Sequence, residues 1–474
     1  MRLGRSNRFA LGQTQPSRRV ASEATSLERK RKSMTFHSRR ALTICLLTAV
    51  LGCWAWGSGM AQTQDTQGFP KPDSIKGLQV QMVDDAIKLG VRHGAINFAL
   101  NGMFATQDQS DAAKWDSDGK TYYFSKSYLA NIDRQVKTLS DAGLVVYLII
   151  LAMPTGNRAI DSLVIHPEAI GDRGSSDRSY TVAASNVQTQ EGQAWLRAAS
   201  EYLADRYSGK EAPHGRVWGW IIGNEVNSHQ MWHYRGPSTL EALVDDYEKI
   251  ARISHESLRK SSQNARVYLS LDHHWTQAHT PDQPTKSVPG KDLIDAFAKL
   301  AKERGDFPWH LAYHPYHSNL FRVDLWNDPQ APVRADTPKI TFRNLEILCE
   351  HMKRPELLWK DNPRSIILSE QGFHSQQTPQ SEQQQAAAYA YAWEKCQRLP
   401  MIDAFIYHRH VDHSQEGGLR LGLWRNVQGS IADPDSPKPI YELFLRAGTP
   451  QWRQAAEPLL PITGLSSWDQ TISK

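Results

Sequence analysis

The chain has 474 residues, and 40% of them are hydrophobic, which is enough for a large core. Its net charge of +5 is unevenly distributed, because residues 1–40 carry eleven Lys and Arg against two Glu. That segment has a net charge of +9, so the remainder carries −4. A mildly acidic body lacks the basic surface that nucleic acids bind, and we expect no nucleic-acid partner.

The basic segment leads into a pattern typical of a secretory signal. Two arginines precede the uncharged apolar run Ala41–Trp56, and small residues at Gly59–Ala61 provide a cleavage point. We interpret 34–61 as a signal peptide. Residues 1–33 then form a mis-assigned or disordered extension ahead of it. This predicts a secreted or periplasmic protein.

Two alternatives for the same segment stay open. The first is a membrane anchor, but Ala41–Trp56 has about 16 residues, and a spanning helix needs about 20. We therefore expect no stable membrane span. The second is lipoprotein processing, which would attach a lipid at Cys53.

After the signal, a polar linker at 62–73 precedes alternating strands and helices. Ile75–Val80 is a weak first strand, and Ala95–Leu100 is the next. Residues 129–139 place apolar side chains at helical spacing, and the apolar run Leu144–Leu151 follows. This alternation is typical of parallel βα units.

The second half of the chain continues the pattern. Residues 152–190 form a long loop, and a loop of that length in a compact domain usually serves binding. Helical stretches then separate five further apolar runs, which are Val217–Ile222, Arg266–Leu271, His310–Tyr313, Ser365–Glu370 and Ile402–Tyr407.

Eight strands alternating with helices predict an α/β fold, a (β/α)8 TIM barrel. The strands start near residues 76, 95, 144, 217, 266, 309, 365 and 402. We expect a single large domain over 74–460, with long βα loops and a C-terminal tail at 461–474. An open doubly wound sheet is the alternative, but it usually carries a Gly-rich phosphate loop after its first strand, and this chain has none there.

Two of the predicted strands end in a glutamate. The run Val217–Ile222 is followed by Gly223 and then by Asn224-Glu225, and the later apolar run ends at Glu370. A Glu at the end of a buried strand is costly unless it is hydrogen-bonded or used chemically. Two such carboxylates are the minimum set for cleaving a glycosidic bond.

This pattern resembles the retaining glycoside hydrolases of clan A, which are (β/α)8 barrels. Their acid/base is the Glu of an Asn-Glu pair ending strand four, and their nucleophile is a Glu ending strand seven. Asn224-Glu225 and Glu370 match those positions, and the resemblance covers roughly residues 75–450. It implies that Glu225 protonates the leaving oxygen while Glu370 attacks the anomeric carbon.

The resemblance extends to the strand-six motif His-x-Tyr, which His314-Pro-Tyr316 fits. It implies that Tyr316 donates a hydrogen bond to Glu370 and that Asn224 bonds the sugar's 2-hydroxyl. Where many relatives close strand eight with Trp, this chain carries His408. The residues that we expect to bind substrate are Asn97, Asn224, Trp275, His314, Tyr316, His408 and Trp424.

Two other functions stay open. Histidines follow several strand ends, and with Asp272 and Asp412 they would suit a metal-dependent hydrolase. They are His273, His274, His314, His317, His374, His408, His410 and His413. A non-catalytic sugar-binding barrel would instead use exposed tryptophans as platforms, namely Trp232, Trp275, Trp326 and Trp424.

The two cysteines beyond the signal, Cys349 and Cys396, either form a disulfide or remain buried thiols. The function that we predict is a secreted retaining O-glycosidase acting on an oligo- or polysaccharide. Its partner is the carbohydrate substrate, and it needs no cofactor and no metal.

Overall fold

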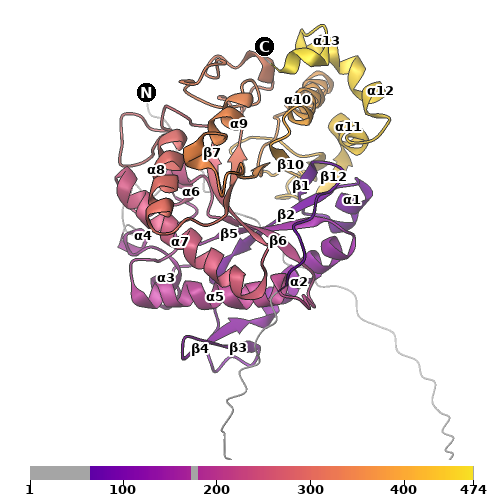
Figure 1. Cartoon of the computed structure of the whole chain (residues 1–474). Helices are drawn as coiled ribbons and strands as arrows, with labels where there is room; N and C mark the ends of the chain where they lie inside the picture. The colour runs from indigo at the N-terminus through magenta and orange to yellow at the C-terminus, as the bar shows by residue number, and fades with distance from the viewer. Residues whose placement is uncertain (1–64, 172–179, 473–474) are drawn as a thin grey trace, which may run out of the picture. The chain divides into compact units, whose positions relative to one another are not determined.

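The computed structural model describes residues 65–171 and 180–472, and eight parallel strands form a closed barrel at its centre (Figure 1). The strands pair in the order β1-β10-β9-β8-β7-β6-β5-β2, and β1 also pairs with β2. Each begins within two residues of its predicted position, so the prediction of a (β/α)8 barrel is confirmed. The bounds are β1 (Lys76–Gln79), β2 (His93–Ala99), β5 (Val145–Leu151), β6 (Val217–Ile222), β7 (Arg266–Asp272), β8 (Trp309–His314), β9 (Ile366–Leu368) and β10 (Ile402–Tyr407).

Helices cover the outside of the barrel, and the long ones begin at capped N-termini. The side chain of Thr189 accepts from the N–H of Gly192, and Thr378 likewise accepts from Ser381. The long helices are α2 (Lys126–Asp141), α5 (Gln190–Ser208), α7 (Leu240–Ser261), α8 (Gly290–Glu303) and α10 (Pro379–Gln397). The shorter ones are α1 (Val83–Lys88), α3 (Arg158–Val164), α4 (Pro167–Gly171), α6 (His229–Trp232), α9 (Glu346–Met352), α11 (Pro439–Arg446), α12 (Trp452–Ala456) and α13 (Leu460–Thr463).

The barrel interior is a separate apolar cluster, distinct from the core between the strands and the helices. Tyr147, Tyr268 and Ile406 are among its members, and all are buried. Gly219 of β6 lies beside Tyr147 of the neighbouring strand β5, and a Cβ there would lie 2.1 Å from the tyrosine ring. Side chains alternate between the two faces of a strand. A residue an even number of positions from one of these interior residues therefore also faces the barrel axis.

An antiparallel hairpin between β2 and α2 was not expected from the sequence. β3 (Ala112–Ser117) pairs with β4 (Lys120–Ser125) across the turn Asp118-Gly119, whose φ angles are 49° and 76°. An Asp-Gly pair with two positive φ angles favours a two-residue hairpin. A second small pair joins β11 (Trp424–Asn426) to β12 (Pro434–Pro437).

Part of the predicted linker packs against the N-terminal end of the barrel. Asp65 accepts from Arg216 Nη1 at 2.5 Å, just before β6. The ring of Phe69 lies 3.7 Å from the guanidinium carbon of Arg266, where β7 begins, and meets Trp218 edge-on. Residues 65–73 therefore lie at the end of the barrel opposite the two glutamates.

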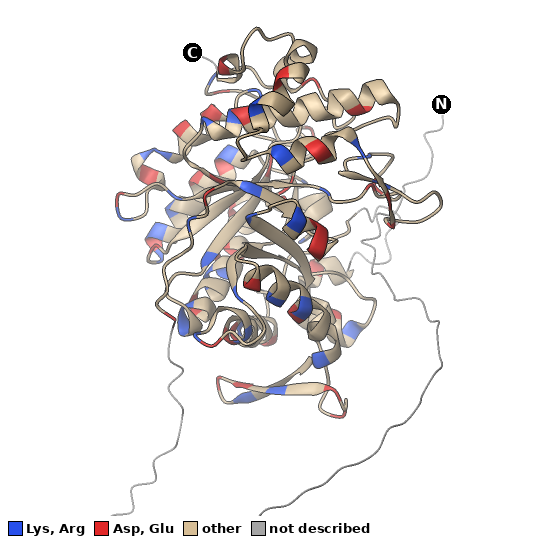
Figure 2. Ribbon diagram, turned by 90° about the vertical axis from the view of Figure 1, so that its right-hand side faces the viewer, with Lys and Arg blue, Asp and Glu red and all other residues tan. Residues whose placement is uncertain are grey.

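The predicted tail packs on the domain as well. α13 and the turn at Trp468 contact α10, and Trp468 is buried in the core. The proposed signal peptide, the preceding extension and Cys53 lie outside the described residues. In the described part of the chain, no helix is long and apolar enough to cross a membrane. Lys and Arg are interspersed with Asp and Glu on the outer helices (Figure 2).

Candidate active site

Glu225 is presented by an unusual turn at the end of β6. Gly223 has φ 74° and Glu225 has φ 42°, so two of three consecutive residues are left-handed. A Cβ at Gly223 would lie 2.6 Å from the His233 ring, which makes glycine necessary there. The Glu225 N–H donates to Ser270 Oγ at 3.1 Å. A non-glycine residue held at positive φ is typical of a functional position.

Glu370 lies two residues beyond β9, and both of its carboxyl oxygens accept hydrogen bonds. Tyr316 Oη donates to Oε1 at 3.3 Å, and Gln79 Nε2 donates to Oε2 at 3.2 Å. At Gly372 the chain passes so close to the His408 carbonyl that a Cβ would lie 1.8 Å from it. This close approach brings the loop after β9 against the loop after β10.

The two glutamates lie close to each other and to His314. One carboxyl oxygen of Glu225, one of Glu370 and a ring nitrogen of His314 all lie within 4.8 Å of one another. Carboxyl groups about 5–5.5 Å apart are typical of retaining glycosidases, and inverting enzymes separate them by about 6.5–9.5 Å. One oxygen of Glu225 and one of Glu370 are therefore close enough for both carboxyl groups to contact one bound molecule.

His314 connects the two strand ends. It lies two residues after Ala312 of β8, which belongs to the barrel interior, so its side chain is on the same face of the strand. Its Nδ1 lies 2.9 Å from Glu225 Oε1, and its Nε2 lies 3.0 Å from Ser369 Oγ. We predicted that His314 binds substrate, but in this structure both ring nitrogens are engaged by the protein.

The surroundings shift the pKa values of the two glutamates in opposite directions. Burial raises the pKa of Glu225, and the hydrogen bond and charge of His314 only partly offset it. Burial also raises the pKa of Glu370, but the charges of His408 and His314 outweigh it and hold that pKa below its usual value. A carboxyl group with a raised pKa beside one with a lowered pKa is the asymmetry that an acid and a nucleophile need in glycoside cleavage.

The other predicted substrate residues differ in their accessibility. Asn97 is exposed and lies two residues after Ala95, a residue of the barrel interior. It therefore faces the open mouth of the barrel. Asn224 is half-buried beside Glu225. Trp424 is half-buried, and its indole N–H donates to Asp85 at 3.0 Å. His408 is hydrogen-bonded to Gln79 and is thereby linked to Glu370.

The prediction for Trp275 is corrected. Its side chain is 1% exposed and belongs to the core between strands and helices. Its ring meets the His351 ring edge-on at a centroid distance of 4.8 Å. With no exposed face, it offers no platform for a sugar, either in a hydrolase or in a sugar-binding barrel.

The histidines do not assemble as one cluster. His408 Nε2 lies 3.0 Å from Glu416, whereas His410 Nε2 lies 3.0 Å from Asp85. Asp272, His274 and His279 do converge within 4.8 Å. Both oxygens of Asp272, however, already accept hydrogen bonds, from Asn227, Ser228, the His274 N–H and the His274 ring.

Sequence reasoning missed three residues that shape the site. Gln79 bonds Glu370 directly, while Glu416 and Arg409 form an ion pair next to His408. A signal for Gln79 was present, because Gly77-x-Gln79 ends the first strand with a polar residue on the interior face. Glu416 lies inside a long loop without periodicity, and nothing local marks it. Cys349 and Cys396 are buried free thiols.

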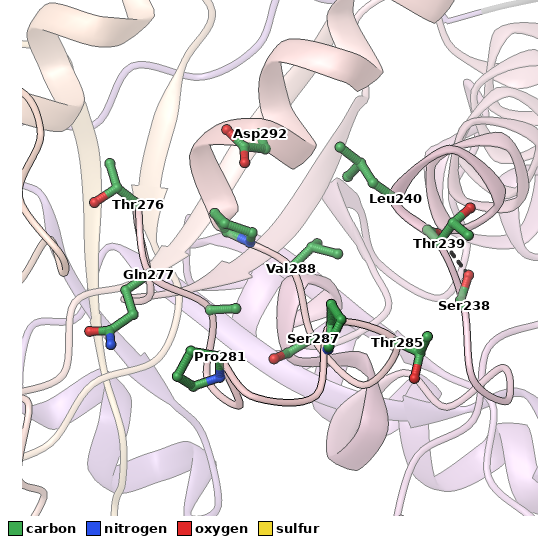
Figure 3. A pocket seen from close by; sticks show the side chains of 13 residues that line it. Ser238, Thr239, Leu240, Thr276, Gln277, Pro281, Thr285, Ser287, Val288 and Asp292 are labelled. Carbon is green, nitrogen blue, oxygen red and sulfur yellow. Dashed lines mark hydrogen bonds between the residues drawn. The ribbon is translucent and has the colours of Figure 1, made fainter.

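A separate pocket of about 560 Å³ lies at the same end of the barrel, between the starts of α7 and α8 (Figure 3). It is lined by hydroxyl and proline side chains of the loop after β7, together with Ser238, Thr239, Leu240 and Asp292. None of the residues that we predicted for the site lines it.

A closed barrel with close carboxyl groups at the ends of its fourth and seventh strands has the fold of the clan A glycoside hydrolases, so the resemblance is confirmed for the fold. Residues 68–471 match a family described as a family of unknown function (DUF5722). The chain belongs to that family. No curated protein matches it.

Solved structures with this fold include a family 39 glycoside hydrolase from Bacteroides cellulosilyticus WH2, with a TM-score of 0.50 and 13% identity. The match covers 80% of this chain and 64% of that one, which is under two thirds of its length. A β-glucosidase from Pyrococcus furiosus has a TM-score of 0.52 and 12% identity, over 80% of this chain and 86% of its own. At these identities the likeness establishes the fold.

Proposed function

We propose that this protein is a retaining O-glycosidase with Glu225 as acid/base and Glu370 as nucleophile. The observation that carries the proposal is the pair itself. One oxygen of each carboxyl group lies within 4.8 Å of the other, and the pKa of Glu225 is raised while that of Glu370 is lowered. The shared fold with a β-glucosidase and a family 39 glycoside hydrolase supports the same class of activity.

The reaction follows from the two protonation states. Protonated Glu225 gives its proton to the glycosidic oxygen as the bond to the anomeric carbon breaks. Ionised Glu370 attacks that carbon and forms a covalent glycosyl–enzyme ester. Glu225, now a carboxylate, takes a proton from water, and that water displaces Glu370 with overall retention. Tyr316 and Gln79 hold the two oxygens of Glu370 during attack.

We further propose that the protein works outside the cytoplasm on an oligo- or polysaccharide. The basic, apolar and small-residue segments of 34–61 support export. Asn97 at the barrel mouth and the partly exposed Trp424 provide polar and aromatic contacts for a sugar.

The test is turnover of a panel of aryl glycosides and oligosaccharides by the full chain, with the first-formed anomer read by proton NMR. We expect retention. Glu225→Gln should lower kcat/KM by about 10²–10⁴-fold, the usual contribution of a general acid. Glu370→Ala with added azide should yield a glycosyl azide, because the small anion replaces the missing nucleophile.

Glu248→Gln is the matched control, since Glu248 is a buried glutamate on α7 paired with Arg252 and Arg304. It should retain activity. Glycan binding without turnover by the wild-type chain would show a sugar-binding barrel instead. An inverted first product would remove Glu370 from the role of nucleophile.

A further inference from the structure

A line of side-chain hydrogen bonds leads away from the nucleophile to a second carboxylate. Glu370 Oε2 accepts from Gln79 Nε2 at 3.2 Å. Gln79 Oε1 lies 2.5 Å from His408 Nδ1, and His408 Nε2 lies 3.0 Å from Glu416 Oε1. The line therefore joins the ends of β9, β1 and β10 to the loop that follows β10.

The chemistry of each group fixes the direction of these bonds. Ionised Glu370 only accepts, so the amide nitrogen of Gln79 faces it and the amide oxygen faces His408. His408 Nδ1 must then donate to Gln79. Ionised Glu416 also only accepts, so His408 Nε2 donates as well. A histidine that donates from both nitrogens is an imidazolium, with a positive charge between two carboxylates.

Glu416 lies where its carboxylate stabilises the positive charge of His408. Its Oε1 accepts from both His408 and Arg409, and its side chain is only 15% exposed. Burial raises the pKa of Glu416, but the charges and hydrogen bonds of His408 and Arg409 bring it down to about 2. Glu416 is therefore ionised throughout the range in which the enzyme would work.

Two members of this line of hydrogen bonds, Gln79 and His408, lie at the ends of barrel strands. β1 and β10 are paired neighbours, with Leu78 opposite Tyr407, so Gln79 and His408 follow directly from a hydrogen-bonded register. The His408 N–H donates to the Gln371 carbonyl at 2.8 Å, which fixes it beside the Glu370 turn. Side chains on strand ends hold a geometry more exactly than side chains on free loops.

We propose that Glu416 is a positioning residue that keeps His408 in its doubly donating form, so that Gln79 presents its N–H to Glu370 and holds the nucleophile ionised and oriented. This inference rests on the proposed glycosidase function and deepens it. Glu416 touches neither substrate nor the reacting atoms in this scheme and acts only through His408 and Gln79.

The charged and titratable groups around His408 determine whether the pKa of Glu370 rises or falls when Glu416 is replaced. Glu416, Arg409 and His413 face it from the loop after β10, and Glu370 faces it from β9. The positive charge of His408 lowers the pKa of Glu370, and the more weakly acting negative charge of Glu416 raises it. Losing both charges together raises the pKa of Glu370, whereas losing Glu416 alone lowers it.

The experiment uses Glu416→Gln and Gln79→Met in the full chain, with two readouts. The first is 15N NMR of histidine side chains at pH 7, with His408 assigned by its loss in His408→Asn. We expect both His408 nitrogens to carry protons in the wild type and one to lose its proton in Glu416→Gln. Gln79→Met leaves the Glu416 pair intact, and there His408 should stay doubly protonated.

The second readout is the pH profile of kcat/KM on an aryl glycoside. The acidic limb should move up by about one unit in Glu416→Gln, with kcat/KM falling about tenfold below that limb. Gln79→Met should move it in the same direction. Glu248→Gln should leave the limb in place, because Glu248 pairs with Arg252 and Arg304 on the outer helices.

The outcomes separate this inference from the proposed function. A wild-type chain that cleaves no glycoside would refute the glycosidase, and the NMR readout alone would then test the line of hydrogen bonds. Retention of both His408 protons in Glu416→Gln would overturn the inference. In an active enzyme, an acidic limb that stays or moves down in that variant would overturn it too.

Discussion

Tyr316 Oη donates a hydrogen bond to Glu370 Oε1 across 3.3 Å, from the loop after β8 to the turn after β9. Burial and the charge of Glu370 raise the pKa of Tyr316 well above its usual value, so the phenol remains a donor at any working pH. The resemblance of His314-Pro-Tyr316 to the strand-six motif of the clan A glycoside hydrolases implied this contact. Together with Gln79 on the other oxygen, Tyr316 fixes the plane of the Glu370 carboxylate.

Tyr316→Phe removes that donor while keeping the ring. We expect kcat/KM to fall about 10–100-fold, because a hydrogen bond to a charged group contributes about 1.5–3 kcal/mol. The acidic limb of the pH profile should rise, since the carboxylate loses a stabilising donor. Steady-state kinetics across pH measure both, and unchanged kinetics would show that Tyr316 does not act on Glu370.

His314→Gln tests the group between the two glutamates. The hydrogen bond and charge of His314 lower the pKa of Glu225, and its charge lowers that of Glu370. Both pKa values should therefore rise in the variant, and both limbs of the kcat/KM profile should move to higher pH. Movement of only one limb would mean that His314 lowers the pKa of only one of the two carboxyl groups.

Asp272→Asn should destabilise the loop that carries Glu225. The Asp272 carboxylate accepts from Asn227 and Ser228, which lie two and three residues after Glu225, and the amide of the variant would turn an N–H₂ group toward one of these donors. We expect a loss of about 3 kcal/mol in the free energy of unfolding. Ser228→Ala removes only one donor and should cost about 1 kcal/mol. Urea unfolding compares the two, and equal losses would contradict this account.

The ionisation of Asp295 makes the free energy of unfolding depend on pH at acidic pH. Asp295 joins α8 to His351 of α9 and to Arg354, which lies two residues beyond α9, and it is 29% exposed. Burial raises the pKa of Asp295, but its bonds to His351 and Lys291 bring it down to about 2. Since the folded pKa lies below the unfolded one, its contribution is present above about pH 4 and is lost as pH falls toward 2.

Asp295→Asn should therefore lower the free energy of unfolding by about 2 kcal/mol at pH 7. The gap between variant and wild type should close as the pH falls toward 2. Urea titrations at several pH values measure the gap. A gap independent of pH would assign the loss to packing rather than to ionisation.

A chelator test addresses the metal-dependent alternative. His408 and His410 bond different carboxylates, and Asp272 has both oxygens occupied by protein donors. We expect glycosidase activity to survive dialysis against EDTA unchanged. Loss of activity that added zinc restores would revive the metal-dependent hydrolase.

The sequence by itself determined the eight strands and the two glutamates. Apolar runs such as Val217–Ile222 record burial on both faces of a strand, and a charged residue two or three residues after the run marks the end of the strand. Both signals are local in the chain. They sufficed to place Glu225 and Glu370 at the ends of the fourth and seventh barrel strands.

Only the tertiary structure decided which residues meet these glutamates. Gln79 and His408 are 329 residues apart and come together because β1 pairs with β10 when the barrel closes. Trp275 is buried through packing against His351, far along the chain, which its own sequence neighbours do not reveal. Side-chain periodicity reports burial along one element, whereas closure and packing depend on elements far apart in the sequence.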